Sequence, residues 1–278
     1  MRALSCLLAL AFGLAAAAPA YALSVQFDEM GFARAINEAR VHDVDGRILG
    51  AVVPHFLPVM GFAASLLKTV AAGDAEIETV ILFGPNHSDE GPAIILTGYG
   101  WHTPFGAMEP DLDAVAAIAA VLPNIRINDG LFYLEYDHSL SIIVPFIKHY
   151  LPQAQIVSIM FNRAVSLSEL ATLADIIHDL SRTKNILMLA SIDFSHYMDI
   201  NETPQRDAFT DNVIRSSDFN TLKNLCSAHL DSPEAMILLM KYAQHFNHEL
   251  LHLDGVIHPE SVRAPHIGYS FHVYAFVD

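Results

Sequence analysis

Residues 48–55 read ILGAVVPH, an unbroken run of apolar or small side chains that ends at a proline and a histidine. A short continuous run of this kind, rich in β-branched residues, is typical of a strand buried on both faces of a parallel sheet. Two later runs end in the same way. Residues 79–83, TVILF, lead within four residues to His87, and residues 185–190, NILMLA, lead within six residues to His196. We therefore expect a sheet whose strand ends carry histidines.

The rest of the chain alternates strands with helices. Further strands are predicted at residues 93–97, 155–159 and 269–277, and helices at residues 59–72, 111–121, 139–150, 166–180 and 233–246. The clearest helix start is at Ser166, which has the spacing of a capping box with Glu169. This alternation predicts an α/β fold in which a central sheet is flanked by helices on both faces.

The composition is typical of a globular protein that does not bind nucleic acid. Of the 278 residues, 53% are hydrophobic and 17% are charged, which is enough to bury a large core. The formal net charge is −16. Because so acidic a chain is repelled by phosphate backbones, no nucleic-acid partner is expected.

Residues 1–22 resemble a secretory signal peptide. Arg2 is their only charged residue, residues 3–18 are apolar or small, and Ala20 and Ala22 supply the small side chains that a signal peptidase reads. An uncleaved anchor is the alternative, but the apolar run is shorter than the ~20 residues of a spanning helix. We therefore predict cleavage after Ala22.

Cleavage divides the chain into a signal peptide (1–22), an N-terminal extension (23–46) and one α/β domain (47–278). A secreted or periplasmic location follows. No second long apolar run is present, so no stable membrane insertion is expected after cleavage. Loss of Cys6 with the signal peptide leaves Cys226 as the single cysteine, which cannot form an internal disulfide.

The histidines that follow strands are the first candidates for a functional site. In open α/β sheets, ligands bind beyond the carboxyl ends of the strands, where His55, His87 and His196 are placed. Asp193 adds a carboxylate at the same edge, although it also fits the role of a turn cap. His138 precedes a predicted helix and is a further candidate. Each residue alone also fits an ordinary structural role; the shared position at strand ends favours a site.

Residues 248–252 read HELLH and match the HExxH pattern of zinc metalloproteases. That chemistry needs a helix, which brings both imidazoles to one face. Residues 250–253 are equally compatible with a strand, on which positions four apart are roughly 13 Å apart and cannot share an ion. A zinc hydrolase is therefore kept as a weaker alternative.

Several segments in fixed order resemble the Memo family. That family includes the protein B member of the AmmeMemoRadiSam set and is related in fold to class III extradiol dioxygenases. The segments that carry the resemblance are 52–56 (VVPHF), 84–88 (GPNHS), 103–106 (TPFG) with Asp111, 137–141 (DHSLS) with 144–146 (VPF), 191–197 (SIDFSHY), 226–227 (CS) and 267–269 (IGY).

The resemblance implies an extradiol-dioxygenase-like fold and one mononuclear metal site. By this mapping the metal ligands are His55, His87 and Cys226, and His196 matches a residue that acts as acid and base. His138 and Asp193 fall in the same cleft and complete the expected catalytic set. Imidazole suits iron, copper and zinc, and a thiolate favours softer ions. We therefore expect one iron or copper ion, with zinc a weaker fit.

Two classes of function follow from such a site. In the first, the metal supports redox or dioxygenase-like chemistry on a small molecule, with His196 as general base. In the second, the protein binds or sequesters iron or copper without turnover. The metal ion is the first expected partner and a small-molecule substrate the second, and no oligomeric state is predicted.

Overall fold

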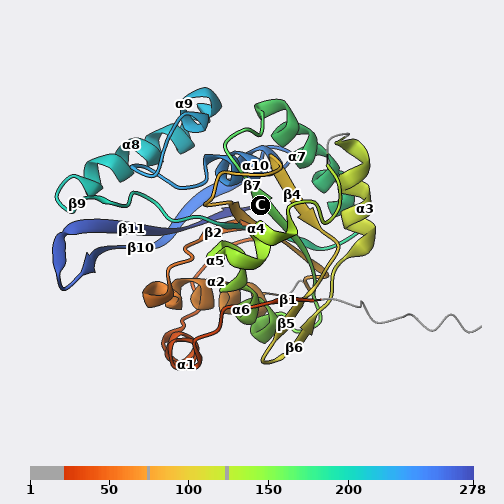
Figure 1. Cartoon of the computed structure of the whole chain (residues 1–278), viewed down its shortest axis with the longest axis horizontal. Helices are drawn as coiled ribbons and strands as arrows, with labels where there is room; N and C mark the ends of the chain where they lie inside the picture. The colour runs from red at the N-terminus through yellow and green to blue at the C-terminus, as the bar shows by residue number, and fades with distance from the viewer. Residues whose placement is uncertain (1–21, 74–75, 123–124) are drawn as a thin grey trace, which may run out of the picture.

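The computed structural model describes residues 22–73, 76–122 and 125–278. Within them, eight strands form one mixed sheet in the order β10-β11-β2-β8-β3-β7-β4, with β9 on the edge of β11 (Figure 1). The strands are β2 (Ile48–Val53), β3 (Thr79–Pro85), β4 (Ile94–Thr97), β7 (Gln155–Phe161), β8 (Ile186–Ser191), β9 (Met198–Asp199), β10 (Glu249–Ser261) and β11 (Ala264–Val277). Three short strands, β1 (Leu23–Ser24), β5 (Trp101–Thr103) and β6 (Gly106–Met108), form a second sheet.

Helices cover both faces of the large sheet, because successive side chains of each strand point to opposite faces. In β3, Ile81 and Phe83 join one apolar core, whereas Val80 and Leu82 join the other. The first core is closed by α3 (Leu112–Val121), α7 (Leu167–Ser181), α8 (Thr203–Arg215), α9 (Phe219–Lys223) and α10 (Pro233–Ala243). The second is closed by α1 (Glu29–Glu38), α2 (Gly61–Ala72), α4 (Leu131–Tyr136), α5 (His138–Ser141) and α6 (Val144–Tyr150).

The centre of the sheet is parallel, and this positions the candidate site. Strands β2, β8, β3 and β7 run in one direction, with Val53 paired to Ser191 and Phe83 to Ala190. Their carboxyl ends therefore meet at one edge. The antiparallel β10–β11 hairpin flanks β2 and projects from the body of the molecule (Figure 1).

The predicted strands are all confirmed, and the mixed α/β architecture with helices on both faces is shown. The expected helix at 139–150 is two helices, α5 and α6, with Pro145 in the first turn of α6, where a missing N–H costs nothing. The expected helix at 59–72 begins as a 3₁₀ turn at Leu57–Val59 before α2. Helices α8 and α9 were not predicted, because α8 reads TPQRDAFTDNVIR and has no clear apolar stripe.

Residues 23–46 pack against the domain. Leu23 is fully buried and pairs in parallel with Trp101, and Phe32 of α1 lies in the second core. The predicted signal peptide lies outside the described residues except for Ala22. In the part of the chain that the structure describes, no helix has the length and apolar character needed to cross a membrane.

One buried carboxylate ties three elements together. Asp111, 2% exposed, caps α3 by accepting from the backbone N–H of Ala114 and also accepts from the hydroxyl of Thr79 in β3 at 2.6 Å. Lys184, just before β8, donates to the same carboxylate at 2.7 Å. Burial raises the pKa of Asp111, but the bonds from Lys184, Thr79 and Ala114 outweigh it and lower this pKa.

We predict that Asp111→Asn destabilises the protein by about 2 to 4 kcal/mol, because it leaves Lys184 without its charged partner. Denaturant unfolding at neutral pH measures this loss. The folded-state pKa is lowered, so the stabilisation is fully present above the ordinary Asp pKa of about 3.9 and is lost as pH falls through the folded value. The exposed Asp113→Asn in the same helix is the control, and equal losses in both variants contradict the prediction.

Candidate metal centre

A cleft of about 630 Å³ lies where the parallel strands end. It is lined by every residue that the sequence analysis proposed for the site: His55, His87, His138, Asp193, His196 and Cys226. Asp231, which precedes α10, lines it as well. The prediction that the strand ends share one cleft is therefore confirmed, and the roles within it depend on the contacts below.

His55 follows β2 and is 1% exposed. Its Nδ1 lies 3.0 Å from the hydroxyl of Ser191, and that hydroxyl donates its only hydrogen to the carbonyl of Ser139 at 2.6 Å. Ser191 can therefore only accept from His55, which places the imidazole hydrogen on Nδ1 and leaves the lone pair on Nε2. The backbone N–H of His55 donates to Asp193 Oδ1 at 2.9 Å, which fixes the turn that carries the ring.

His87 follows β3 and is held in the same way by Asp137. Its backbone N–H donates to Asp137 Oδ2 at 2.9 Å, and its Nδ1 lies 3.0 Å from both carboxylate oxygens. Nδ1 therefore carries a hydrogen, and Nε2 again faces the cleft centre. Burial lowers the pKa of His87, but the carboxylates of Asp137 and Asp231 raise it to about 10.

Asp231 faces both of these nitrogens. Its Oδ2 lies 3.0 Å from Nε2 of His55 and 3.7 Å from Nε2 of His87. Its Oδ1 accepts from the backbone N–H of Asp193 at 3.2 Å, and its own N–H donates to the Asp193 carbonyl at 3.0 Å. The carboxylate is thus fixed in orientation, and its side chain is only 5% exposed.

This arrangement requires a cation. When both imidazoles are neutral, with their hydrogens on Nδ1, Oδ2 of Asp231 is a buried acceptor without a hydrogen bond and faces two nitrogen lone pairs. Three electron-rich atoms repel one another unless positive charge lies between them. Either protons on His55 and His87 or one metal ion supplies it. Burial raises the pKa of Asp231, but the two imidazoles outweigh it and hold this pKa below its ordinary range.

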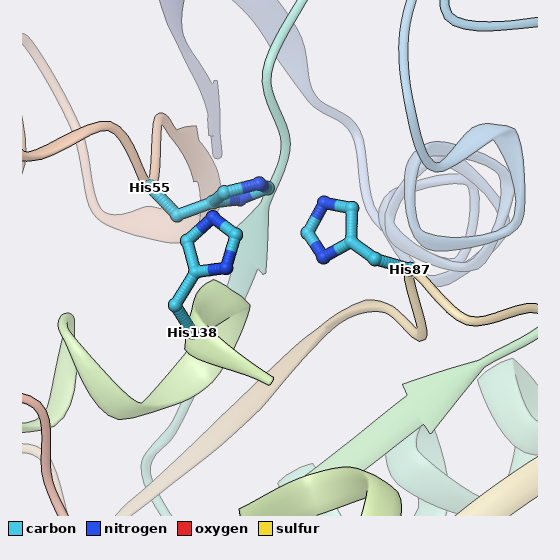
Figure 2. A group of neighbouring side chains, drawn as sticks. All are labelled: His55, His87 and His138. Atoms are coloured by element: carbon cyan, nitrogen blue, oxygen red, sulfur yellow. The ribbon is translucent and has the colours of Figure 1, made fainter. Parts of the chain in front are cut away.

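His138 closes the third side of the cluster. Its ring stacks on His87 at 4.9 Å and meets His55 edge-on at 5.4 Å, and Figure 2 shows the three rings around one space. One nitrogen from each ring lies within 4.8 Å of the others. Burial, with the neighbouring His55 and His87, lowers the pKa of His138 to about 4, so this ring is neutral at pH 7 and offers a lone pair.

Asp193 lies behind His55 rather than beside it. One carboxylate oxygen accepts the His55 backbone N–H, and the other lies 3.8 Å from Nε2 of the same residue. Burial raises the pKa of Asp193, and the charge of Asp231 raises it further. Asp193 forms a second group of converging donor atoms with His55 and Asp231. It therefore orients the His55 turn and stands near the metal position.

The ring of His196 is oriented by a backbone carbonyl. Its Nδ1 lies 2.6 Å from the carbonyl of Phe194 and must donate to it, so Nε2 keeps its lone pair. The ring stacks on Tyr269 at 5.8 Å. His196 is part of the cleft wall, but in the described chain it belongs to neither group of converging donor atoms.

Cys226 lines the cleft as an exposed, free thiol. Within the described residues, its sulfur is not among the donor atoms that converge within 4.8 Å of one another. Its role as a metal ligand therefore stays a prediction. Asp231 and Asp137 were not proposed from the sequence, because each precedes a helix and fits the ordinary role of a cap.

The interpretation of residues 248–252 as a zinc-protease motif is wrong, because Glu249 begins the strand β10 and this segment is not helical. His252 Nε2 lies 3.0 Å from Nδ1 of His272 on the neighbouring strand, and His252 is not a lining residue of the cleft. His248 and His252 therefore lack the helical face that a zinc protease needs.

Comparison with known proteins identifies the family of the chain. Residues 42–272 match the family model described as Memo-like protein. The chain belongs to the Memo-like family. A MEMO1 family protein of Pyrobaculum arsenaticum is 32% identical over 166 residues, 58% of this chain and 58% of that protein. One from Methanosarcina mazei is 30% identical over 179 residues, 62% of each.

The matched part thus spans about six-tenths of these curated relatives. Among solved structures, an uncharacterised protein of Escherichia coli K12 covers 81% of this Memo-like chain and 99% of its own, with 11% identity and a TM-score of 0.45.

We predict that Asp137→Asn weakens Fe(II) binding about 10- to 100-fold. The substitution removes the charge that orients His87 and raises its basicity, and outer partners of metal-binding histidines have effects of this size. Anaerobic equilibrium dialysis with Fe(II) alone measures the affinity. The control is Asp175→Asn, which removes an exposed carboxylate from α7. Equal affinity in the parent and both variants would show that Asp137 does not support a metal ligand.

Proposed function

We propose that this Memo-family chain binds one transition-metal ion, iron or copper, through His55 and His87. The ion serves redox or dioxygenase-like chemistry on a small molecule. One observation carries the proposal: two imidazoles, each held through Nδ1, turn their Nε2 atoms towards one oxygen of the buried Asp231 carboxylate. Metal-binding histidines are held through their second nitrogen in this manner.

The residues present fit such an ion. Atoms bound about 2.1 Å from one ion lie roughly 3.0 to 3.4 Å apart, depending on geometry. The distances of 3.0 and 3.7 Å from Asp231 Oδ2 to the two Nε2 atoms are close to that range. When bound, the ion would supply a Lewis acid and a redox centre at the head of the cleft. Cys226, which the family resemblance implies as a ligand, lines the same cleft.

The walls of the cleft favour a flat, partly apolar substrate. Phe56 stacks on Tyr269 at an interplanar angle of 10°, and Tyr269 stacks on His196 at 15°. A small aromatic or phenolic molecule matches these parallel rings. His196, with its lone pair on Nε2, would take the proton of a phenolic hydroxyl as that oxygen binds.

The alternative is a metal-binding protein without turnover. It is favoured by the exposed Cys226 thiol in the cleft wall, which suits capture of a soft ion such as Cu(I). This alternative assigns no function to the Nε2 atom of His196. The two functions therefore differ in whether His196 matters beyond metal binding.

We predict that His196→Gln retains its metal but loses about 10²- to 10⁴-fold in rate, the usual effect of removing a general base. Oxygen uptake by the iron-loaded protein with a panel of catechols measures the rate, and metal analysis of the same samples measures occupancy. His178→Gln on α7 is the matched control. If parent and variants hold metal fully and none turns over, the metal-binding alternative is correct. Loss of metal from His196→Gln would make His196 a ligand.

We also propose that the chain is exported, and this part of the proposal can be tested separately. We expect protein recovered from the cell envelope to begin at Leu23, whose backbone N–H bonds to the carbonyl of Gly100 and would still do so as a free amine. N-terminal sequencing of the envelope and cytoplasmic fractions shows where the chain starts. An intact Met1 chain confined to the cytoplasm would contradict export.

A further inference from the structure

We infer that Asp231, rather than Cys226, is the third protein ligand, so that the metal is held by two histidines and one carboxylate. This inference rests on the proposed metal binding and goes further by naming the donor set. It departs from the His/His/Cys set that the family resemblance implies.

The position of the Asp231 carboxylate is fixed by contacts on both sides of the residue. A backbone bridge pairs Phe194 with Leu230, so the residue before Asp231 is fixed against the end of β8. On the other side, Ser232 caps α10 by accepting from the N–H of Ala235. The N–H of Asp193 holds Oδ1, which leaves Oδ2 as the oxygen turned to the histidines.

The burial of Asp231 points to a bound cation. Its side chain is 5% exposed, and within the described residues its ion-pair partners are His55 and His87 rather than a lysine or arginine. A buried carboxylate without a permanent positive partner is strongly unfavourable. A divalent ion between Oδ2 and the two Nε2 atoms removes that cost and uses all three lone pairs.

Cys226 is placed differently. It is exposed, and its carbonyl accepts from the N–H groups of His229 and Leu230, so it begins the turn that leads inward to Asp231. Arg163 fixes the start of this turn by donating to the Leu225 carbonyl at 2.5 Å. The turn thus leaves the thiol on the exposed side and carries the carboxylate into the buried one.

The donor set decides which ions the site prefers. Two imidazoles and one carboxylate suit Fe(II) and similar ions with open coordination positions, whereas a thiolate would shift preference towards Cu(I). Three protein ligands would leave coordination positions of the ion open for a small oxygen-containing molecule. The inference therefore assigns to this cleft a divalent ion with open coordination positions, such as Fe(II).

Anaerobic metal binding by three variants of the full chain tests the assignment. We expect Cys226→Ser to bind Fe(II) within about twofold of the parent, and Asp231→Asn to bind at least about 100-fold more weakly, since it loses a ligand rather than an outer partner. Asp175→Asn is again the control. The Co(II)-loaded parent should lack the near-ultraviolet thiolate-to-metal band, and Cys226→Ser should have the same spectrum.

A gain-of-signal variant keeps the test valid if Asp231→Asn fails to fold. Asp231→Cys in the Cys226→Ser background should acquire the thiolate-to-Co(II) band, because position 231 would then present sulfur to the ion. A parent band that disappears in Cys226→Ser, together with full metal binding by Asp231→Asn, overturns the inference and leaves the proposed metal binding intact. Failure of the parent to bind Fe(II) or Co(II) overturns both.

Discussion

Oδ2 of Asp231 and Nε2 of His55 lie 3.0 Å apart with both side chains almost fully buried. When His55 and His87 are neutral, Oδ2 of Asp231 has no hydrogen bond within the described residues, and Nε2 of His55 carries a lone pair because Ser191 fixes the hydrogen of His55 on Nδ1. Because both side chains are almost fully buried, positive charge between them, from protons or from a bound ion, relieves their repulsion. The hydrogen bonds around the cleft serve to hold these two atoms, with His87, in that arrangement.

The scaffold explains how these side chains are held close together. His55 follows β2, His87 follows β3 and Asp231 is bridged to the segment after β8, so three chain segments end at one rigid parallel edge. Asp137 and Asp193 hold the backbone N–H groups of the two histidines, which stops the rings from turning away. A rigid support of this kind holds the side chains in the positions that the proposed ion would need.

The fold and the histidines could be predicted from the sequence, because strands buried on both faces appear as continuous apolar runs. Ligands bind beyond the ends of such strands, and the histidines lie at those positions. Sequence reasoning missed α8, whose burial comes from packing rather than from an apolar stripe. It also missed Asp231, because an aspartate before Ser232-Pro233 reads as part of a helix start. Contacts distant in sequence turn that carboxylate inward: the bridge between Phe194 and Leu230 fixes the residue before it, and the N–H of Asp193 orients it.

The cleft can form only after β11 has paired with β2. β2 lies between β8 and β11, so the strand that carries His55 completes its hydrogen bonds only after residues 264–277 have been made. A sheet built on such distant pairings folds late and slowly. During synthesis the histidines are therefore scattered on an open chain with no common ion. On the proposed function, metal occupancy would report that folding is complete, and an exported chain that crosses a membrane unfolded would acquire its ion on the far side.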